Sequence, residues 1–185
     1  MLSSVVSAVT LVRHPESRGG AVRSVGARVR KERGGTLAIT YSIEGNLLRV
    51  RVPPPRAPRI AHGLWQHTCC ECFVALKGTP EYHEFNFAPS GEWAAHAFTK
   101  YRDGAPLANE ALNPRITVRS DAQRLDLDVS ISLDRLSSMH PRATLVLALA
   151  AVIEEEDAVL SYWALKHPAG KPDFHHRDSF ALELE

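Results

Sequence analysis

Apolar and polar residues alternate over long parts of the chain. In residues 37–43 and 125–131 every second side chain is large and apolar, and the residues between are polar or small. A period of two is typical of a strand with one buried and one solvated face. The turn sequence "RGG" predicts a hairpin between residues 22–31 and 36–43. These segments should therefore be neighbouring antiparallel strands.

Further turn sequences predict further hairpins. Residues 116–119 and 125–131 flank a polar turn at 120–123, and "EGN" predicts that residues 37–43 pair with a strand at 47–52. "PPPRAP" predicts a stiff extended connection, because proline does not fit the interior of a sheet. Helix patterns are weak: the segment "SLDRLSSM" (132–139) predicts a short helix, and residues 106–112 at most one turn. The fold class expected is all-β: an antiparallel β-sandwich of about ten strands with at most one or two short helices.

Composition and charge narrow the class of protein. The 185 residues are 44% hydrophobic, with 22 basic and 21 acidic residues. This is typical of a single domain, here residues 1–185. A net charge of +1 gives no general attraction to nucleic acid or to a membrane surface, so neither is an expected partner. No run reaches the roughly 18 apolar residues of a membrane span, and the N-terminus lacks the basic region of a secretory signal, which predicts a cytoplasmic location.

The segment "TCCECFVAL" contains all three cysteines and sorts into two faces if it is a strand. Cys70 and Cys72 point one way, while Cys69 and Glu71 point the other. In the next segment, "YHEFNF", the side chains of Tyr82, Glu84 and Asn86 share a face. If the two segments form a hairpin across "KGTPE", the apolar sets share one face of the sheet. Glu71, Glu84 and Asn86 would then form a polar row on the opposite face.

Aromatic and charged residues near this row suggest a ligand. Carboxylates and an amide beside flat aromatic rings suit a sugar, since the ring packs on its C–H face and polar groups take its hydroxyls. A loop bounded by proline and glycine, "HPAGKPDFHHRDS", can supply the rim of such a site. We therefore expect a site for a carbohydrate or a similar small polar ligand. Its candidate residues are Trp65, Glu71, Glu84, Asn86, Trp93, Tyr101, Arg102, His167 and Lys171.

Other kinds of chemistry are weaker alternatives. No cofactor, metal site or catalytic residue is predicted, because the cysteines lack the second pair that structural zinc uses and no nucleophile motif surrounds them. A divalent cation beside Glu71 remains an alternative. Haem is another, with a His or Met as axial ligand; Met139, the only methionine besides the first residue, adjoins His140. An enzyme that uses Glu71 and Glu84 as an acid–base pair, as in glycoside hydrolysis, is the third. The sequence sets no oligomeric state.

The residues just described also resemble a known family. The segments "LWQHTCCECFVAL", "YHEFNFAPSGEWAAHAFTKYRDG" and "YWALKHPAGKPDFHHRDSFALEL" resemble bacterial DOMON-like proteins, which are related to the family 9 carbohydrate-binding modules. The resemblance runs from about residue 37 to the end and is strongest over residues 64–104. It implies a β-sandwich and a non-catalytic ligand-binding module. Sugar is the ligand class that it favours, and haem is the ligand of other DOMON relatives.

Overall fold

The computed structural model describes residues 6–136 and 143–185 and is built almost entirely of antiparallel strands. The strands are β1 Val6–Arg13, β2 Val22–Lys31, β3 Thr36–Gly45, β4 Cys69–Leu76, β5 Tyr82–Phe87, β6 Trp93–Lys100, β7 Asp103–Pro106, β8 Arg115–Ser120, β9 Arg124–Ser132, β10 Leu145–Glu154, β11 Leu160–Ala164 and β12 Leu182–Leu184. The described residues also form six one-turn 3-10 helices: η1 Arg33–Gly35, η2 Leu47–Arg49, η3 Leu64–Gln66, η4 Glu110–Leu112, η5 Leu133–Arg135 and η6 Arg177–Ser179.

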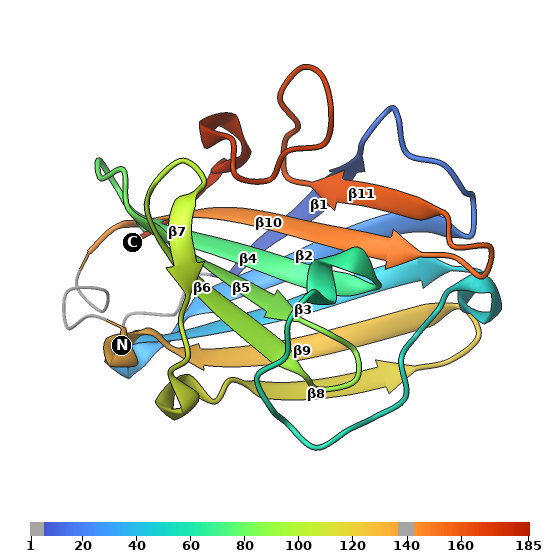
Figure 1. Ribbon diagram of the computed structural model, residues 1–185, viewed down its shortest axis with the longest axis horizontal. Helices are drawn as coiled ribbons and strands as arrows, with labels where there is room; N and C mark the ends of the chain where they lie inside the picture. Colours follow the sequence, from blue (N-terminus) through green and yellow to red (C-terminus); the bar gives the residue numbers. More distant parts are fainter. Residues whose placement is uncertain (1–5, 137–142) are drawn as a thin grey trace.

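The strands form two layers that are joined along one side (Figure 1). The back layer has the order β1-β2-β3-β9-β8, and the front layer has the order β7-β6-β5-β4-β10-β11. Strand β1 belongs to both: it pairs with β2 over most of its length and with β11 at Val12 and Arg13. The short β12 pairs with the start of β10. The predicted antiparallel β-sandwich is therefore confirmed.

The core fills the space between the layers. Alternate side chains of both sheets point inward, as in Leu127 of the back layer and Phe85 and Leu149 of the front layer, all without exposed surface. The two layers are also tied by a polar contact, since the buried Tyr41 hydroxyl donates a hydrogen bond of 2.7 Å to the Glu71 carbonyl. Burying side chains of this size stabilises the fold by about 1.5–3 kcal/mol each.

Most of the predicted hairpins are present, and one is not. β2 pairs with β3, and β8 pairs with β9, as their alternation indicated. The strand expected at residues 47–52 is wrong, because this segment begins with the turn η2. Both edges of β3 are already occupied by β2 and β9. The backbone amides of Asn46 and Leu47 instead donate to Ala21 and Ala122 in neighbouring loops.

Helical structure is limited to single turns in the described residues. The helix expected at 132–139 is the turn η5 as far as residue 136, and residues 137–142 lie outside the described part. Met139 and His140, which were named with the haem alternative, lie there too. The turn expected within residues 106–112 is η4. No helix in the described ranges is long and apolar enough to cross a membrane.

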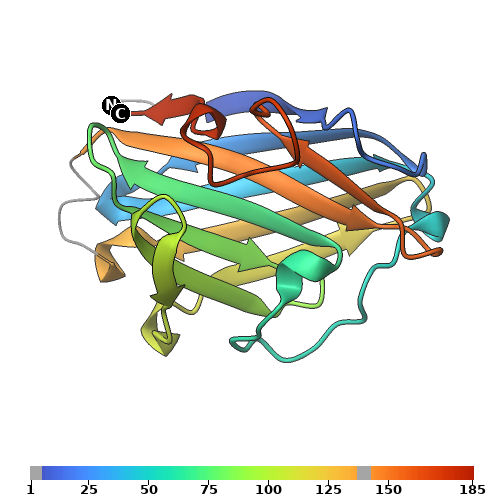
Figure 2. The ribbon, with the colours of Figure 1, turned by 45° about the horizontal axis from the view of Figure 1, so that its top comes forward.

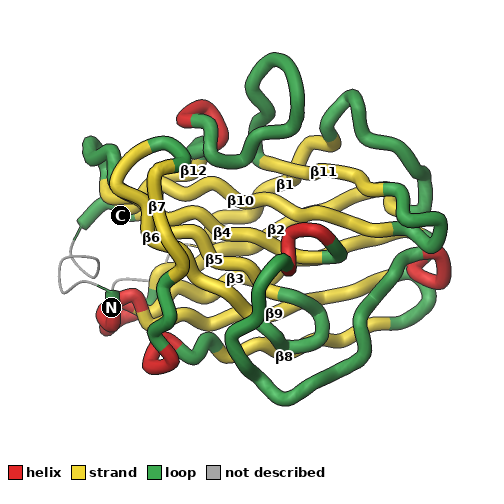
Figure 3. The backbone as a smooth tube through the Cα atoms, viewed as in Figure 1, coloured by secondary structure: helices red, strands yellow, loops and turns green. Residues whose placement is uncertain are grey.

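Two segments cover the outer face of the front layer. The turn η3 packs against β4 and β5 and is drawn in front of the sheet (Figure 3). Residues 165–181, which follow β11, cross over the same side of the molecule (Figure 2). Phe174 and Phe180 of this segment pack with Phe73, Tyr82 and Ala148 in a second, smaller apolar cluster. The turn η3 and residues 165–181 thus cover part of the outer face and leave a cavity between them.

Candidate functional site

The strand register brings the predicted polar row together on the outer face of the front layer. Glu71 of β4 lies directly opposite Asn86 of β5, and Glu84 of β5 lies opposite His96 of β6. Glu71 and Glu84 are diagonal neighbours on the same face. The cysteines separate as alternation predicted, with Cys70 and Cys72 in the core between the layers and Cys69 on the other face.

A cavity of about 370 Å³ lies over this row, and we call it the polar pocket. Its floor crosses five adjacent strands, from β6 to β11, which is why residues far apart in the sequence meet there. The outer segments supply its walls. It is lined by Trp65, Glu71, Glu84, His96, Phe98, Arg102, Val152, Tyr162, Pro172, Phe174 and His175.

Glu84 is the centre of the polar contacts in this pocket. The Asn86 amide donates a hydrogen bond of 2.7 Å to Glu84 Oε1. His96 Nδ1 lies 4.0 Å from Oε1, and His175 Nε2 lies 3.6 Å from Oε2. Burial raises the pKa of Glu84, while the bond from Asn86 and the proximity of His96 oppose that rise. Asn86 itself has no exposed surface, so it supports Glu84 from below.

A chain of hydrogen bonds fixes the His175 ring beside Glu84. The Arg102 backbone N–H donates to the Tyr82 hydroxyl at 3.1 Å, and that hydroxyl lies 2.9 Å from His175 Nδ1. If Tyr82 donates its hydrogen to Nδ1, the ring proton is on Nε2, 3.6 Å from Glu84 Oε2. Burial, helped by the Arg102 charge, lowers the pKa of His175 to about 4. The ring is therefore neutral at pH 7.

Glu71 differs from Glu84 in having no close partner. Only 3% of its surface is exposed, and its carboxyl accepts no hydrogen bond from the part of the chain that the structure describes. Burial, and then the nearby Glu84 carboxylate, raise its pKa well above the usual value. A carboxyl that keeps its proton can donate one hydrogen bond and accept others, whereas an ionised carboxylate only accepts.

Aromatic rings stand at the edges of the pocket. Trp65 on η3 is 41% exposed and contacts His96 edge to face, with ring centroids 5.9 Å apart. Tyr162 of β11 and Phe174 of the covering loop lie 6.3 Å apart between centroids on the β11 side. The lining of the pocket thus includes both carboxyl groups and aromatic side chains.

The remaining predicted residues lie in different places. Trp93 is 2% exposed and packs in the core between the layers, so it does not line the pocket. Tyr101 and Arg102 reach across to Asp173, with contacts of 2.6 and 2.8 Å that close one side of the pocket. His167 binds the Val12 carbonyl through Nε2 at 2.8 Å and is not among the lining residues. Lys171 lines a neighbouring cavity together with Arg102 and Asp173.

Several lining residues were not among the predicted ones. His96 and Phe98 follow Ala94 on alternate positions of "WAAHAF", so alternation through β6 could have placed both of them on this face. Phe174 and His175 belong to an irregular loop, and no periodic pattern marks them. Nothing in the described residues gathers three or more His, Cys, Asp or Glu side chains in a geometry that holds a metal ion.

Comparisons with known proteins agree with the fold. No protein-family model matches the chain, and no curated protein matches its sequence. Among solved structures, a protein of Bacteroides uniformis ATCC 8492, provisionally assigned as carbohydrate-binding, superposes with a TM-score of 0.68 at 13% identity over 96% of this chain and 84% of that one. A family 9 carbohydrate-binding module of Caldicellulosiruptor kristjanssonii, solved with cellotriose, gives 0.51 at 8% identity over 89% and 75%. The chain therefore has the fold of these proteins.

Proposed function

We propose that the protein binds a carbohydrate, or a similar small polar ligand, without transforming it, and that the polar pocket is the site. The observation that carries the proposal is the pair Glu71 and Glu84 on one sheet face between Trp65 and Tyr162. A sugar offers hydroxyl groups at its edge and C–H groups on its faces. The floor of the pocket matches the first and its walls match the second.

The protonation of the two carboxyls adds to this match. A sugar hydroxyl both donates and accepts, so a floor with both kinds of partner satisfies it best. Glu71, with its raised pKa, supplies a donor, and Glu84 accepts from Asn86 and keeps further lone pairs free. The volume of about 370 Å³ suits one or two sugar rings. The sugar-binding descriptions of the two structures with a similar fold support the same class of ligand.

Calorimetric titration with glucose, cellobiose and cellotriose tests the proposal. We expect saturable binding of at least one of them to the wild-type protein. Glu84→Gln should weaken it at least tenfold, because a hydrogen bond to a charged group contributes about 1.5–3 kcal/mol. Trp65→Ala should weaken it several-fold. The exposed Glu81, which does not line the pocket, gives the matched control Glu81→Gln. Failure of these sugars and of a wider glycan panel to bind would contradict the proposal.

Hydrolysis of a glycosidic bond is the second candidate function. Both carboxyls line the same open pocket, and Arg102 pairs with Asp173 rather than with either of them. One carboxyl that keeps its proton beside one that ionises more readily is the arrangement that acid–base chemistry needs. Release of nitrophenol from aryl glucosides, galactosides and xylosides, lost in both Glu71→Gln and Glu84→Gln, would support it. Binding of a sugar with no such release would leave only the binding role.

A further inference from the structure

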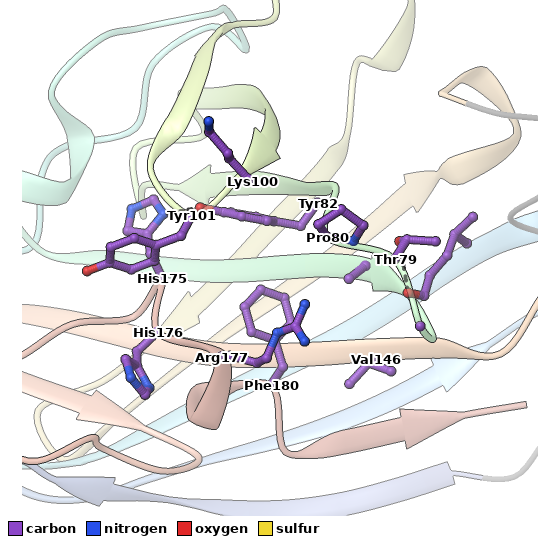
Figure 4. Close-up of a pocket in the computed structure, with 13 residues that line it drawn as sticks. Thr79, Pro80, Tyr82, Lys100, Tyr101, Val146, His175, His176, Arg177 and Phe180 are labelled. Atoms are coloured by element: carbon purple, nitrogen blue, oxygen red, sulfur yellow. Dashed lines mark hydrogen bonds between the residues drawn. The ribbon is translucent and has the colours of Figure 1, made fainter.

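A second cavity opens on the same face of the front layer, and we call it the apolar groove (Figure 4). It encloses about 700 Å³ and is lined by Ala75, Leu76, Gly78, Thr79, Pro80, Tyr82, Lys100, Tyr101, Val146, His175, His176, Arg177 and Phe180. The contacts from Tyr101 and Arg102 to Asp173 stand between it and the polar pocket. The two cavities share His175 but have different linings. We therefore treat the groove as a separate site.

The groove has a rigid, apolar floor. Tyr82 lies flat against Phe98, with ring centroids 4.6 Å apart and planes 5° apart, and its hydroxyl is held by Arg102 and His175. Phe180 contacts Tyr82 edge to face at 5.5 Å. A preformed apolar cavity of this volume is within the range that binds small molecules.

The charged side chains that line the groove are all basic. The lining includes Lys100 and Arg177 but neither Asp nor Glu. Lys100 lies 3.7 Å from the Asp103 carboxylate, so its charge is partly balanced. The exposed Arg177 side chain forms no ion pair or hydrogen bond within the described residues. Arg177 lines the groove together with Tyr82, Val146 and Phe180, and Figure 4 shows these four side chains. An unpaired cation beside an apolar floor is complementary to a ligand with an apolar body and one negative charge.

We propose that the apolar groove binds a small amphipathic carboxylate. Its apolar ring or chain lies on Tyr82 and Phe180, and its carboxylate pairs with the Arg177 guanidinium. A guanidinium binds a carboxylate through two parallel hydrogen bonds, which favours this anion over a neutral group of the same shape. The ligand class differs from that of the polar pocket, where the Glu84 carboxylate in the floor would repel an anion.

The test compares two probes that differ only in charge, 2-naphthoate and 2-naphthamide, by calorimetric titration of the full chain. The wild-type protein should bind the carboxylate at least tenfold more tightly than the amide. Arg177→Gln should abolish this preference and leave the binding of the amide unchanged. The matched control is Arg28→Gln, which removes an exposed arginine from the back layer. Equal affinity of the wild-type protein for the two probes, or a preference that survives in Arg177→Gln, would overturn the proposal.

Two further variants locate the site. Val146 lies half-buried in the floor, and Val146→Phe should fill part of the groove and weaken both probes several-fold. Trp65→Ala alters only the polar pocket and should leave the binding of naphthoate unchanged. Weaker sugar binding in Trp65→Ala with naphthoate binding intact separates the two sites. Absence of binding of either probe to the wild-type protein at millimolar concentration would reject the groove as a ligand site.

Discussion

The carboxyl groups of Glu71 and Glu84 lie on one sheet face and are both largely shielded from water. Ionising both would place two negative charges on neighbouring strands in a medium of low polarity, which costs free energy. Glu84 has Asn86 and two histidine rings nearby, whereas Glu71 has none of these contacts. The proton therefore belongs on Glu71, and this residue links the stability of the fold to pH.

Replacement of Glu71 by glutamine should change how stability depends on pH. The raised pKa means that the native state retains a proton that the unfolded chain releases above about pH 4.5. The protonated Glu71 therefore makes its full contribution to the free energy of unfolding below that pH. This contribution falls as the pH rises, by at most about 1.4 kcal/mol per pH unit. Thermal unfolding between pH 5 and 9 should show the advantage of Glu71→Gln over the wild-type protein growing with pH. Parallel curves for the two proteins would contradict the assignment of the proton.

Single residues also show what the sequence could and could not predict. Alternation placed Glu71, Glu84 and Asn86 correctly, since a strand turns successive side chains to opposite faces. Trp93 was expected near them, but it lies opposite Phe87 in the register of β5 and β6 and therefore faces the core with it. That register depends on how the turn at residues 88–92 folds. No local pattern could place His175, which reaches the site by tertiary packing of an irregular loop.

At the scale of elements, the hairpin of β6 and β7 holds in place the segment of residues 165–181, which covers the polar pocket. Its turn consists of Tyr101 and Arg102, and both side chains bind the Asp173 carboxylate. Arg102 has a left-handed φ of 55°, which a non-glycine residue adopts only when its surroundings require it. Burial alone would raise the pKa of Asp173, but the bonds from Tyr101 and Arg102 outweigh it and lower the pKa.

Asp173→Asn should increase the mobility of the covering segment, residues 165–181, without unfolding the sandwich. The ion pair is partly exposed, so its loss should cost at most about 1 kcal/mol. Hydrogen exchange should become several-fold faster for backbone amides of residues 165–176 and remain unchanged in β2 and β3 of the back layer. The matched comparison is Asp157→Asn, a substitution of an exposed aspartate in the turn after β10. Faster exchange throughout the molecule would show that the contact supports the whole fold instead.

The same hairpin depends on a glycine that leaves room for a neighbouring strand. A Cβ on Gly104 would lie 2.3 Å from the Ala97 carbonyl oxygen and 2.5 Å from the Phe98 ring. Gly104→Ala should therefore force β6 and β7 apart and destabilise the protein by about 1–3 kcal/mol. Gly20→Ala is the control, because a Cβ there meets nothing within 4 Å. The free energy of unfolding in urea measures both, and equal values for the two variants would contradict this account.

At the scale of the whole molecule, the three buried thiols lie on two different sides of the front layer. Cys70 and Cys72 lie in the core between the sheets, and burial raises the pKa of both. Cys69 lies on the other face, where its Sγ is 3.9 Å from Asn86 Oδ1 and the turn η3 packs over the ends of β4 and β5. Burial and the nearby Glu71 raise its pKa as well. All three thiols are therefore unreactive until the protein opens.

The architecture predicts that the thiols react with Ellman's reagent in two kinetic phases. Opening of η3 alone can expose Cys69, whereas Cys70 and Cys72 become accessible only when the layers separate, which is global unfolding. One equivalent should react first with little dependence on urea, and two should follow at a rate that rises with urea as global unfolding does. Cys69→Ala should remove the fast phase only. If all three thiols react in one phase at the global rate, η3 and the front sheet open together, and the outer face is as stable as the core.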